Sequence, residues 1–276
     1  MAVTAASNTP AAFGALLRAW RAARKVSQLE LSLAATVSQR HLSFLESGRA
    51  RPSRQMVLQL AETLEVPLRE RNALLTAAGF APYYCERSLE DAAMKPVRDA
   101  LEQMLAHHQP YPAVVVDRDY DLVLANPAFD GLIGIAGEPA ALWRACCGDG
   151  PRNLLRLTFH RDGVRPYIRN FDAVGPMMLA RSWREAIARG SRISAFLETL
   201  RGDPDIPSHW HTPDPTRPPP PVMPLELARG ETTLRLFAMI ATFGTPYDVT
   251  TDELRVETFF PTDAASEALL RAHATL

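Results

Sequence analysis

Residues 27–53 read SQLELSLAATVSQRHLSFLESGRARPS, and this stretch predicts the fold of the N-terminal part of the chain. Ser27 and Glu30 have the spacing of a capping box, in which the serine caps a helix start and the glutamate returns to the serine amide. Ser38 is a second candidate helix cap, and Gly48 suits the left-handed residue that stops a helix. Two short helices separated by a tight turn form a helix-turn-helix.

Further helices flank this pair on both sides. Phe13, Leu17 and Trp20 recur at helical spacing before it. A fourth helix is expected to begin near Ser53, after Pro52, and a fifth spans residues 68–78 before Gly79. Five short helices between residues 10 and 80 predict a compact all-α bundle.

The net charge of −1 on the 276 residues conceals an uneven distribution. Residues 1–80 contain ten basic and five acidic side chains, whereas the remaining residues contain 20 basic and 26 acidic ones. A small basic part joined to a larger acidic part indicates that the first meets a polyanion and the second has another task. Ordinary solvated helix faces are the alternative explanation of the basic charge.

In the second part the hydrophobic period changes from 3.6 to two. Val114 and Val116, then Leu122 and Leu124, alternate around a polar turn, which predicts a β-hairpin. Further strands are expected at 154–159, 225–227, 233–243 and 254–260. Helices are expected at 91–107, 172–189, 193–200 and 262–274, and a short helix begins at 126–129. The nine prolines between residues 204 and 224 favour an extended loop. This mixture predicts an α+β domain with an antiparallel sheet.

Composition excludes several classes of protein. Apolar residues make up 47% of the chain and charged residues 22%, which rules out a wholly disordered chain. No apolar run approaches the roughly 18 residues of a membrane span. The three cysteines lack metal-ligand spacing, and the first residues lack the pattern of a secretory signal. We therefore expect a cytoplasmic protein with neither a disulfide framework nor a zinc site.

Enzymatic interpretations are disfavoured as well. The chain has no GxSxG, HExxH, Walker or GxGxxG motif. A self-cleaving repressor with a Ser/Lys dyad needs a lysine near the sheet, and Lys25 and Lys95 both precede it. The histidines at 107–108, 209 and 211 lack supporting metal-ligand spacing. We expect no enzymatic activity and no cofactor.

The run from Phe13 to Phe80 resembles the Xre/Cro/phage-repressor (lambda-repressor-like) class of helix-turn-helix domains. The matching residues are SQLEL at 27–31, VS at 37–38, Leu42, LESGR at 45–49 and PS at 52–53. The resemblance implies a DNA-binding domain in which Arg21 and Glu46 form a structural ion pair. Thr36 stands where this class usually has glycine. Because a positive φ costs a β-branched residue about 1–2 kcal/mol, we expect a turn of different shape.

Candidate DNA contacts can be sorted by position. Phosphate contacts supply salt-dependent affinity, whereas base-edge contacts supply sequence choice. With Leu42 and Leu45 pointing inward, the third helix leaves four side chains for base contacts in the major groove: Gln39, Arg40, Ser43 and Phe44. The predicted phosphate contacts are Gln28, Ser38, Arg49, Arg51 and Arg54. Two alternatives stay open, namely packing of Phe44 over the fourth helix and phosphate binding by Arg40.

The string VVVDRDYDLVLANPAF at 114–129 resembles the opening strand pair and helix of a PAS-like sensor. Together with segments 40–53, 67–75, 243–250 and 257–261, it is similar to the MmyB-like regulators. The resemblance spans nearly the whole chain. It implies an Xre-type domain joined to a PAS-like ligand-binding domain, with fatty-acid-like ligands and a regulatory role.

Side chains of the second part provide an inventory for a ligand pocket. Large apolar groups suit the wall of a pocket for an acyl chain: Phe159, Met177, Trp183, Phe237, Met239 and Phe243. Four polar groups are candidates for holding an anionic head group: His160, Arg165, Arg169 and Asn170. An ordinary core explains the first set equally, and solvated surface explains the second.

These observations predict a transcription regulator. Residues 10–80 form a five-helix DNA-binding domain, residues 81–95 a linker, and residues 96–276 an α+β PAS-like domain. The expected partners are double-stranded DNA, a small apolar acid as effector, and a second copy of the chain in a homodimer. The alternative is a DNA-binding regulator whose C-terminal domain binds another protein rather than a small molecule.

Overall fold

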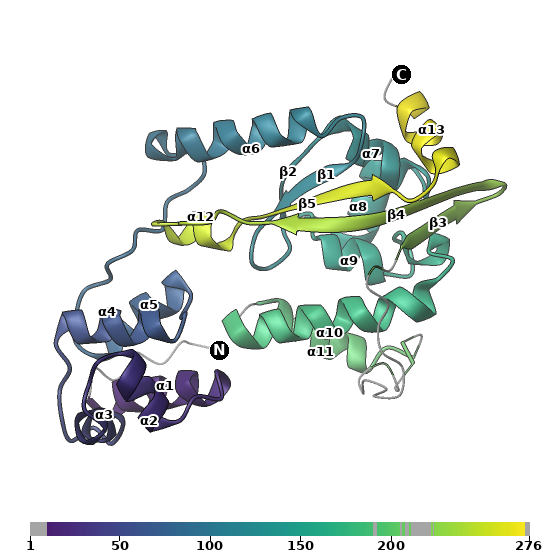
Figure 1. The fold of residues 1–276 in the computed structure, drawn as a ribbon. Helices are drawn as coiled ribbons and strands as arrows, with labels where there is room; N and C mark the ends of the chain where they lie inside the picture. The colour runs from purple at the N-terminus through teal and green to yellow at the C-terminus, as the bar shows by residue number, and fades with distance from the viewer. Residues whose placement is uncertain are drawn as a thin grey trace. The chain divides into compact units, whose positions relative to one another are not determined.

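The computed structural model describes residues 10–189, 192–204, 206–207, 210, 222 and 224–273. The chain divides into two compact units, each of which is described by itself (Figure 1). The first holds the chain up to Arg87 together with Thr245–Asp252, and the second holds Ser88–Gly244 and the chain from Glu253 onward. The division after Arg87 falls within the predicted linker. Most of the predicted proline-rich loop lies outside the described residues.

The first unit contains the predicted bundle of five helices: α1 (Pro10–Ala23), α2 (Gln28–Ala34), α3 (Gln39–Glu46), α4 (Arg54–Thr63) and α5 (Leu68–Ala77). Ser27 and Glu30 form the predicted capping box of α2, and Ser38 caps α3. Buried residues from all five helices meet in one apolar core, which includes Phe13, Leu17, Leu31, Leu42, Leu45, Leu60 and Leu75.

The turn between α2 and α3 contains a left-handed residue. Thr36 has a φ of 52°, and Gly48, after α3, has a φ of 71°. The chain therefore keeps the left-handed conformation at Thr36 at a cost of about 1–2 kcal/mol relative to glycine. Our expectation that the β-branched side chain would avoid this conformation was wrong.

Helices α1 and α3 approach each other closely at Gly14. A Cβ atom added at Gly14 would lie 2.5 Å from the carbonyl oxygen of Leu45 and 2.6 Å from that of Glu46. These oxygens belong to the backbone of α3, so they cannot move away without displacing the helix. Glycine at this position therefore sets how closely α3 lies against α1.

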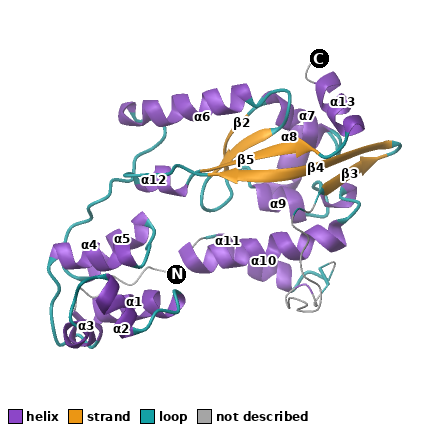
Figure 2. Cartoon of the chain, in the orientation of Figure 1, coloured by secondary structure: helices purple, strands orange, loops and turns teal. Residues whose placement is uncertain are grey.

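The second unit is built on one antiparallel sheet, shown in orange in Figure 2. Its strands are β1 (Ala113–Val116), β2 (Leu122–Ala125), β3 (Leu225–Arg229), β4 (Thr232–Ala241) and β5 (Arg255–Pro261), in the order β2-β1-β5-β4-β3. Every residue of β1 is buried. This burial follows from its interior place in the sheet and from apolar clusters on both faces.

Helices cover the two faces of the sheet. Ala113 and Val115 pack with α6 (Lys95–His107), whereas Val114 and Val116 pack with residues of the helices on the other face. The remaining helical elements of this unit are η1 (Ala92–Met94), α7 (Pro127–Gly134), α8 (Pro139–Cys147), α9 (Leu154–Phe159), η2 (Arg165–Tyr167), α10 (Phe171–Arg189), α11 (Ile193–Arg201) and α13 (Ala264–His273). Helix α12 (Val249–Glu253) belongs, except for its last residue, to the first unit. The predicted α+β fold with an antiparallel sheet is confirmed.

One predicted strand is wrong, because residues 154–159 form helix α9. The side chain of Asn153 caps this helix by accepting a hydrogen bond of 3.1 Å from the amide of Arg156. Periodicity cannot assign a six-residue apolar run to helix or strand. Its three leucines favour a helix more than β-branched residues would. Helices α8 and α12 were also not predicted from the sequence.

Residues Thr245–Asp252, here named the β4–β5 arm, connect two strands of the sheet but pack in the first unit. The amide of Val249 donates a hydrogen bond of 2.8 Å to the carbonyl oxygen of Cys85. Two residues further on, Arg87 pairs with the carboxylate of Asp248 at 2.9 Å. The arm therefore lies alongside the chain segment that leaves the first unit.

The arm also caps a helix of the five-helix bundle. Leu68, the first residue of α5, donates its amide to the carboxylate of Asp252 at 3.1 Å. The residue before α5 is Pro67, which gives no side-chain cap. Helix α5 thus receives its N-terminal cap from a residue 184 positions later in the sequence.

The close approach at Gly14 predicts a loss of stability on adding one methyl group. Gly14→Ala should lower the free energy of unfolding of the first unit by about 1–3 kcal/mol, the usual cost of overpacking. Urea unfolding followed by circular dichroism measures this change. Gly134→Ala, in α7, is the control, because an added Cβ there meets nothing within 4 Å. Equal stability of Gly14→Ala and the wild type would show that the two helices are not in such close contact.

Candidate DNA-binding helix and ligand cavity

Helix α3 presents a polar and aromatic surface. Gln39 and Arg40 are exposed, and Ser43 and Phe44 are half-buried. Leu42 is fully buried, as predicted from its place on the inner face. The guanidinium of Arg40 lies 5.4 Å from the centre of the Phe44 ring. The structure thus brings the four predicted base-contacting side chains together on one helix face, where arginine and glutamine can reach base edges.

Cationic side chains lie in and after the loop that follows this helix. Arg49, Arg51 and Arg54 are exposed, and the Arg54 guanidinium lies 5.3 Å from the ring centre of Tyr83. Ser38 is also exposed and uses its hydroxyl oxygen to cap α3. Exposed arginines near a helix-turn-helix suit contacts with phosphate, although DNA contact by these residues stays a prediction.

A buried carboxylate connects helices α1, α2 and α3 of the first unit. Glu46 is 1% exposed and accepts hydrogen bonds from Nε and Nη2 of Arg21, at 2.6 and 3.0 Å. The amide of Gln28 donates to the same carboxylate at 2.7 Å, and Arg18 lies 3.8 Å away. Residues of α1 and α2 are therefore tied to the end of α3. The predicted Arg21–Glu46 pair is present, and Gln28, expected to bind phosphate, joins it.

These contacts determine the charge of Glu46. Burial alone would raise the pKa of the carboxyl group, but the hydrogen bonds from Arg21 and Gln28 outweigh burial and lower it. A carboxyl group whose pKa is lowered by folding stabilises the fold above its unfolded pKa, and this contribution is lost as the pH falls through the folded pKa. Glu46 is thus ionised and paired at neutral pH.

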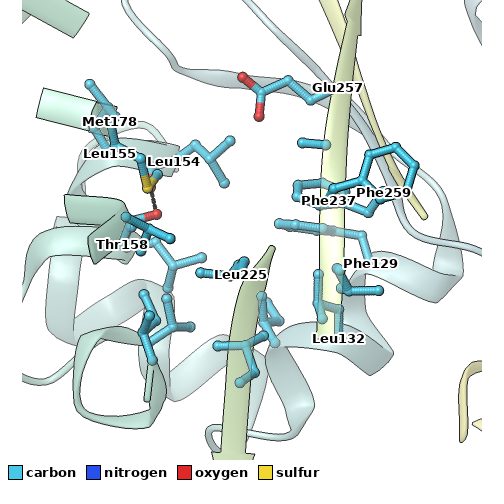
Figure 3. A pocket seen from close by; sticks show the side chains of 18 of the residues that line it. Phe129, Leu132, Leu154, Leu155, Thr158, Met178, Leu225, Phe237, Glu257 and Phe259 are labelled. Carbon is cyan, nitrogen blue, oxygen red and sulfur yellow. Dashed lines mark hydrogen bonds between the residues drawn. The ribbon is translucent and has the colours of Figure 1, made fainter. Parts of the chain in front are cut away.

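The second unit contains an apolar cavity of about 550 Å³. Figure 3 shows side chains of α9 and α10 facing those of β4 and β5 across it. The lining includes Phe129, Leu132, Leu155, Leu157, Val174, Met178, Leu225, Leu227, Leu236, Phe237 and Phe259. Three lining residues are largely exposed and mark the opening of the cavity: Met177, Val222 and Met239.

One part of the lining is polar. Glu257 of β5 projects toward the cavity in Figure 3, and Nη2 of Arg181 donates to its carboxylate at 3.1 Å. Burial alone would lower the pKa of Arg181, but the carboxylates of Glu257 and Glu185 raise it, so the guanidinium is charged. The hydroxyl of Thr158, another lining residue, donates to a backbone carbonyl oxygen at 2.8 Å. Hydrogen-bonding groups available to a ligand therefore gather at Arg181 and Glu257.

The apolar residues predicted to line a pocket fall into two groups. Met177, Phe237 and Met239 line the cavity. Phe159 and Trp183 pack in the cluster formed with α11, and Phe243 packs against the cluster around α6. Ligand contact by these last three residues stays a prediction without support from the cavity's lining.

The four predicted head-group residues have other partners in the structure. Asn170 donates to the carbonyl oxygen of Pro224 at 2.7 Å and accepts from the amide of Glu226 at 3.0 Å. The remaining contacts are Arg165 with Asp203 at 3.7 Å, the Arg169 amide with the Glu226 carbonyl at 2.8 Å, and His160 Nδ1 with the Asp162 amide at 3.1 Å. His160, Arg165, Arg169 and Asn170 are not among the described residues that line this cavity.

Sequence reasoning missed Arg181 and Glu257, which form the polar part of the lining. Arg181 lies three residues after Met178, one turn along the predicted long helix. A charged residue on the apolar face of an amphipathic helix was the available signal. Glu257 stands on β5, the strand between β1 and β4. The sequence alone does not indicate that these two residues face each other.

Metal binding and cysteine chemistry find little support in the described residues. The described part of the chain holds no group of three or more His, Cys, Asp or Glu residues able to bind a metal ion. His209 and His211 lie outside the described residues. Burial raises the pKa of Cys146 to about 11, so its thiol stays protonated and is a poor nucleophile near neutral pH. Within the described ranges, no helix is long and apolar enough to cross a membrane.

Two family models match this chain. A helix-turn-helix family model matches residues 17–71, and the model of the MmyB-like transcription regulator ligand binding domain matches residues 97–272. No curated protein sequence matches the chain. Among solved structures, the chain is similar to an RNA-binding Light-Oxygen-Voltage receptor, at 16% sequence identity and a TM-score of 0.27. That match covers 94% of this chain and 61% of the receptor, so the chain spans less than two thirds of the receptor's length.

The ligand-binding family model spans well over half of the 276 residues, and it begins after the helix-turn-helix match ends. The chain therefore belongs to the MmyB-like transcription regulators, with a helix-turn-helix DNA-binding domain followed by a ligand-binding domain.

Proposed function

We propose that this protein is a one-component regulator that reads a DNA sequence with α3 and alters its DNA binding when a small apolar ligand fills the cavity. The observation that carries the proposal is the apolar cavity of about 550 Å³ in a chain whose other unit is a helix-turn-helix. Pockets for small molecules usually measure about 300–1,000 Å³ and combine apolar walls with a few polar groups. This cavity has both properties.

The proposed effector is fatty-acid-like, with a flexible apolar chain and one polar head. Leucine, phenylalanine and methionine side chains dominate the lining, and Met177 and Met178 suit it to chains of variable shape. The resemblance to MmyB-like regulators supports the same class of ligand. We propose a regulatory rather than catalytic role for the cavity, in a cytoplasmic protein.

Base-specific contacts are proposed for Gln39, Arg40, Ser43 and Phe44. Their shared helix face and the exposure of Gln39 and Arg40 support this assignment. A homodimer is expected because helix-turn-helix proteins commonly bind two half-sites related by a two-fold axis.

The β4–β5 arm offers a route between ligand and DNA binding. Phe237 of β4 and Phe259 of β5 line the cavity, and the chain between these strands contains the arm that caps α5 through Asp252. A ligand that changes the ends of β4 and β5 can therefore change the support of α5 through continuous chain. Such coupling requires that the ligand bind two conformations with different affinity.

Replacing two base-reading side chains should remove sequence preference. In Gln39→Ala/Arg40→Ala, operator affinity should fall at least tenfold while affinity for unrelated DNA falls less, since each bidentate base contact contributes about 1–3 kcal/mol of discrimination. Fluorescence anisotropy with both DNAs at several salt concentrations measures this. Arg51→Ala is the control, because loss of a phosphate contact weakens both DNAs alike and flattens the salt dependence. Unchanged operator preference in the double variant would refute the base-reading assignment.

Filling the cavity should exclude its ligand. Leu236→Phe adds volume at a lining residue, so native mass spectrometry should detect less bound amphiphile than in the wild type, at similar thermal stability. Leu197→Phe, at an equally buried residue outside the lining, should instead cost about 1–3 kcal/mol of stability. A wild-type protein that carries no small molecule and ignores added long-chain amphiphiles would favour a protein-binding role for this domain.

Removing the cap on α5 should weaken the ligand response. In Asp252→Ala, ligand-induced change in operator affinity should shrink severalfold, and the amides at the start of α5 should exchange hydrogen faster. Asp91→Ala is the matched control, because Asp91 caps η1 by accepting from the amide of Ala93 at 2.8 Å. An Asp252→Ala protein with the full ligand response would show that the arm does not transmit it.

A further inference from the structure

We propose that the Arg181–Glu257 pair is a head-group site that takes an uncharged hydrogen-bonding group, such as an alcohol, a primary amide or a protonated carboxylic acid, in preference to a carboxylate or an ammonium ion. This inference rests on the proposed ligand-sensing function and specifies its ligand class.

The charges that line the cavity already balance each other. Among the described lining residues, Arg181 and Glu257 are the two that carry charge. Their side chains contact each other at 3.1 Å, and Glu257 is 5% exposed. An incoming carboxylate would meet a fixed, buried negative charge, and an incoming ammonium ion would meet the guanidinium. Either ion also loses hydration on entering an apolar cavity, which disfavours its charged form.

The side chains next to the Arg181–Glu257 pair do not alter its charge balance. Tyr120, another lining residue, donates its hydroxyl to Glu185, and Arg255 donates to the same carboxylate. Glu185 and Arg255 form an ion pair of their own. The polar wall therefore combines two acidic and two basic side chains, with no excess charge to attract an ion of either sign.

Hydrogen-bonding capacity nevertheless remains at this wall. The Nε–H of Arg181 is buried and has no hydrogen-bond partner among the described residues. The carboxylate of Glu257 accepts from Arg181 through Oε1 and is a hydrogen-bond acceptor on its second oxygen as well. A hydroxyl or primary amide supplies both an acceptor and a donor, because its oxygen accepts from Arg181 and its O–H or N–H donates to Glu257.

A buried donor without a partner favours a ligand with a polar head over a purely apolar one. Burying an unsatisfied polar group is unfavourable, so a ligand that accepts from Arg181 Nε–H relieves this cost. A purely apolar chain leaves that donor unsatisfied. A fatty acid fits the pair best when protonated, because the neutral acid accepts from Arg181 and donates to Glu257, whereas its carboxylate would be repelled by Glu257. Its affinity should therefore fall as the acid ionises.

Three probes with one chain length test the proposal in the full-length protein: dodecanamide, dodecanoate and dodecylamine. Isothermal titration calorimetry at pH 8 should give a Kd for dodecanamide at least tenfold lower than for either charged probe. Dodecanoate should bind more tightly at pH 5 than at pH 8, whereas dodecanamide should change little. The titratable or charged groups at this wall are Arg181, Glu257, Tyr120, Glu185 and Arg255. Any effect of their ionisation would also change the affinity for dodecanamide, which itself carries no charge at either pH.

Replacing each charged side chain by glutamine identifies which one discriminates against each charged probe. Glu257→Gln removes the negative charge at unchanged size, so it should improve dodecanoate binding at pH 8 at least tenfold and bring it level with dodecanamide. Arg181→Gln should instead improve dodecylamine. Glu226→Gln is the control, because Glu226 lies on β3 outside the lining and should leave all three affinities unchanged.

The outcomes separate two failures. Dodecanoate binding to the wild type at pH 8 as tightly as dodecanamide, or no gain for dodecanoate in Glu257→Gln, overturns the head-group assignment alone. Failure of all three probes to bind a wild-type protein that carries no endogenous ligand overturns the ligand-sensing function and the head-group site together.

Discussion

The buried carboxylate of Glu46 is the interaction on which the DNA-binding unit depends. It lies at the end of α3 and accepts hydrogen bonds from Arg21 of α1 and Gln28 at the start of α2. Breaking a buried ion pair by removing one partner commonly costs about 3–5 kcal/mol, because the other charge is left uncompensated. The close contact at Gly14 adds a steric constraint at the same helix. Together these contacts hold α3 in one orientation, and the base contacts proposed for Gln39 and Arg40 depend on a helix held in this way.

The second unit follows a different principle, because its centre includes a cavity as well as packed side chains. Strands β4 and β5 contribute to the cavity wall, and the arm between them belongs to the DNA-binding unit, where Asp252 caps α5. The structural support of α5 and the wall of the cavity are thus parts of one continuous stretch of chain. Within the first unit, Cys85 and Arg87 are bonded to the arm.

Local signals in the sequence explain which elements could be predicted. Serine caps, helical spacing and strand alternation gave the five-helix bundle and the antiparallel strands, since these signals act over a few residues. The strand expected at 154–159 was wrong, because a short apolar run is ambiguous and Asn153 went unrecognised as a cap. The contacts of Asp252 with α5 and of Arg181 with Glu257 join residues far apart in sequence. Spacing carries no information about such contacts, so the polar part of the cavity could be found only from the fold.

The central claim is that occupancy of the cavity changes DNA binding. The most direct measurement is the Kd of the wild-type protein for its operator, selected from random DNA, with and without saturating dodecanamide at constant salt. The account predicts at least a tenfold difference between the two Kd values, which corresponds to a coupling free energy of about 1.4 kcal/mol. Equal Kd values, with native mass spectrometry showing the cavity filled, would contradict it.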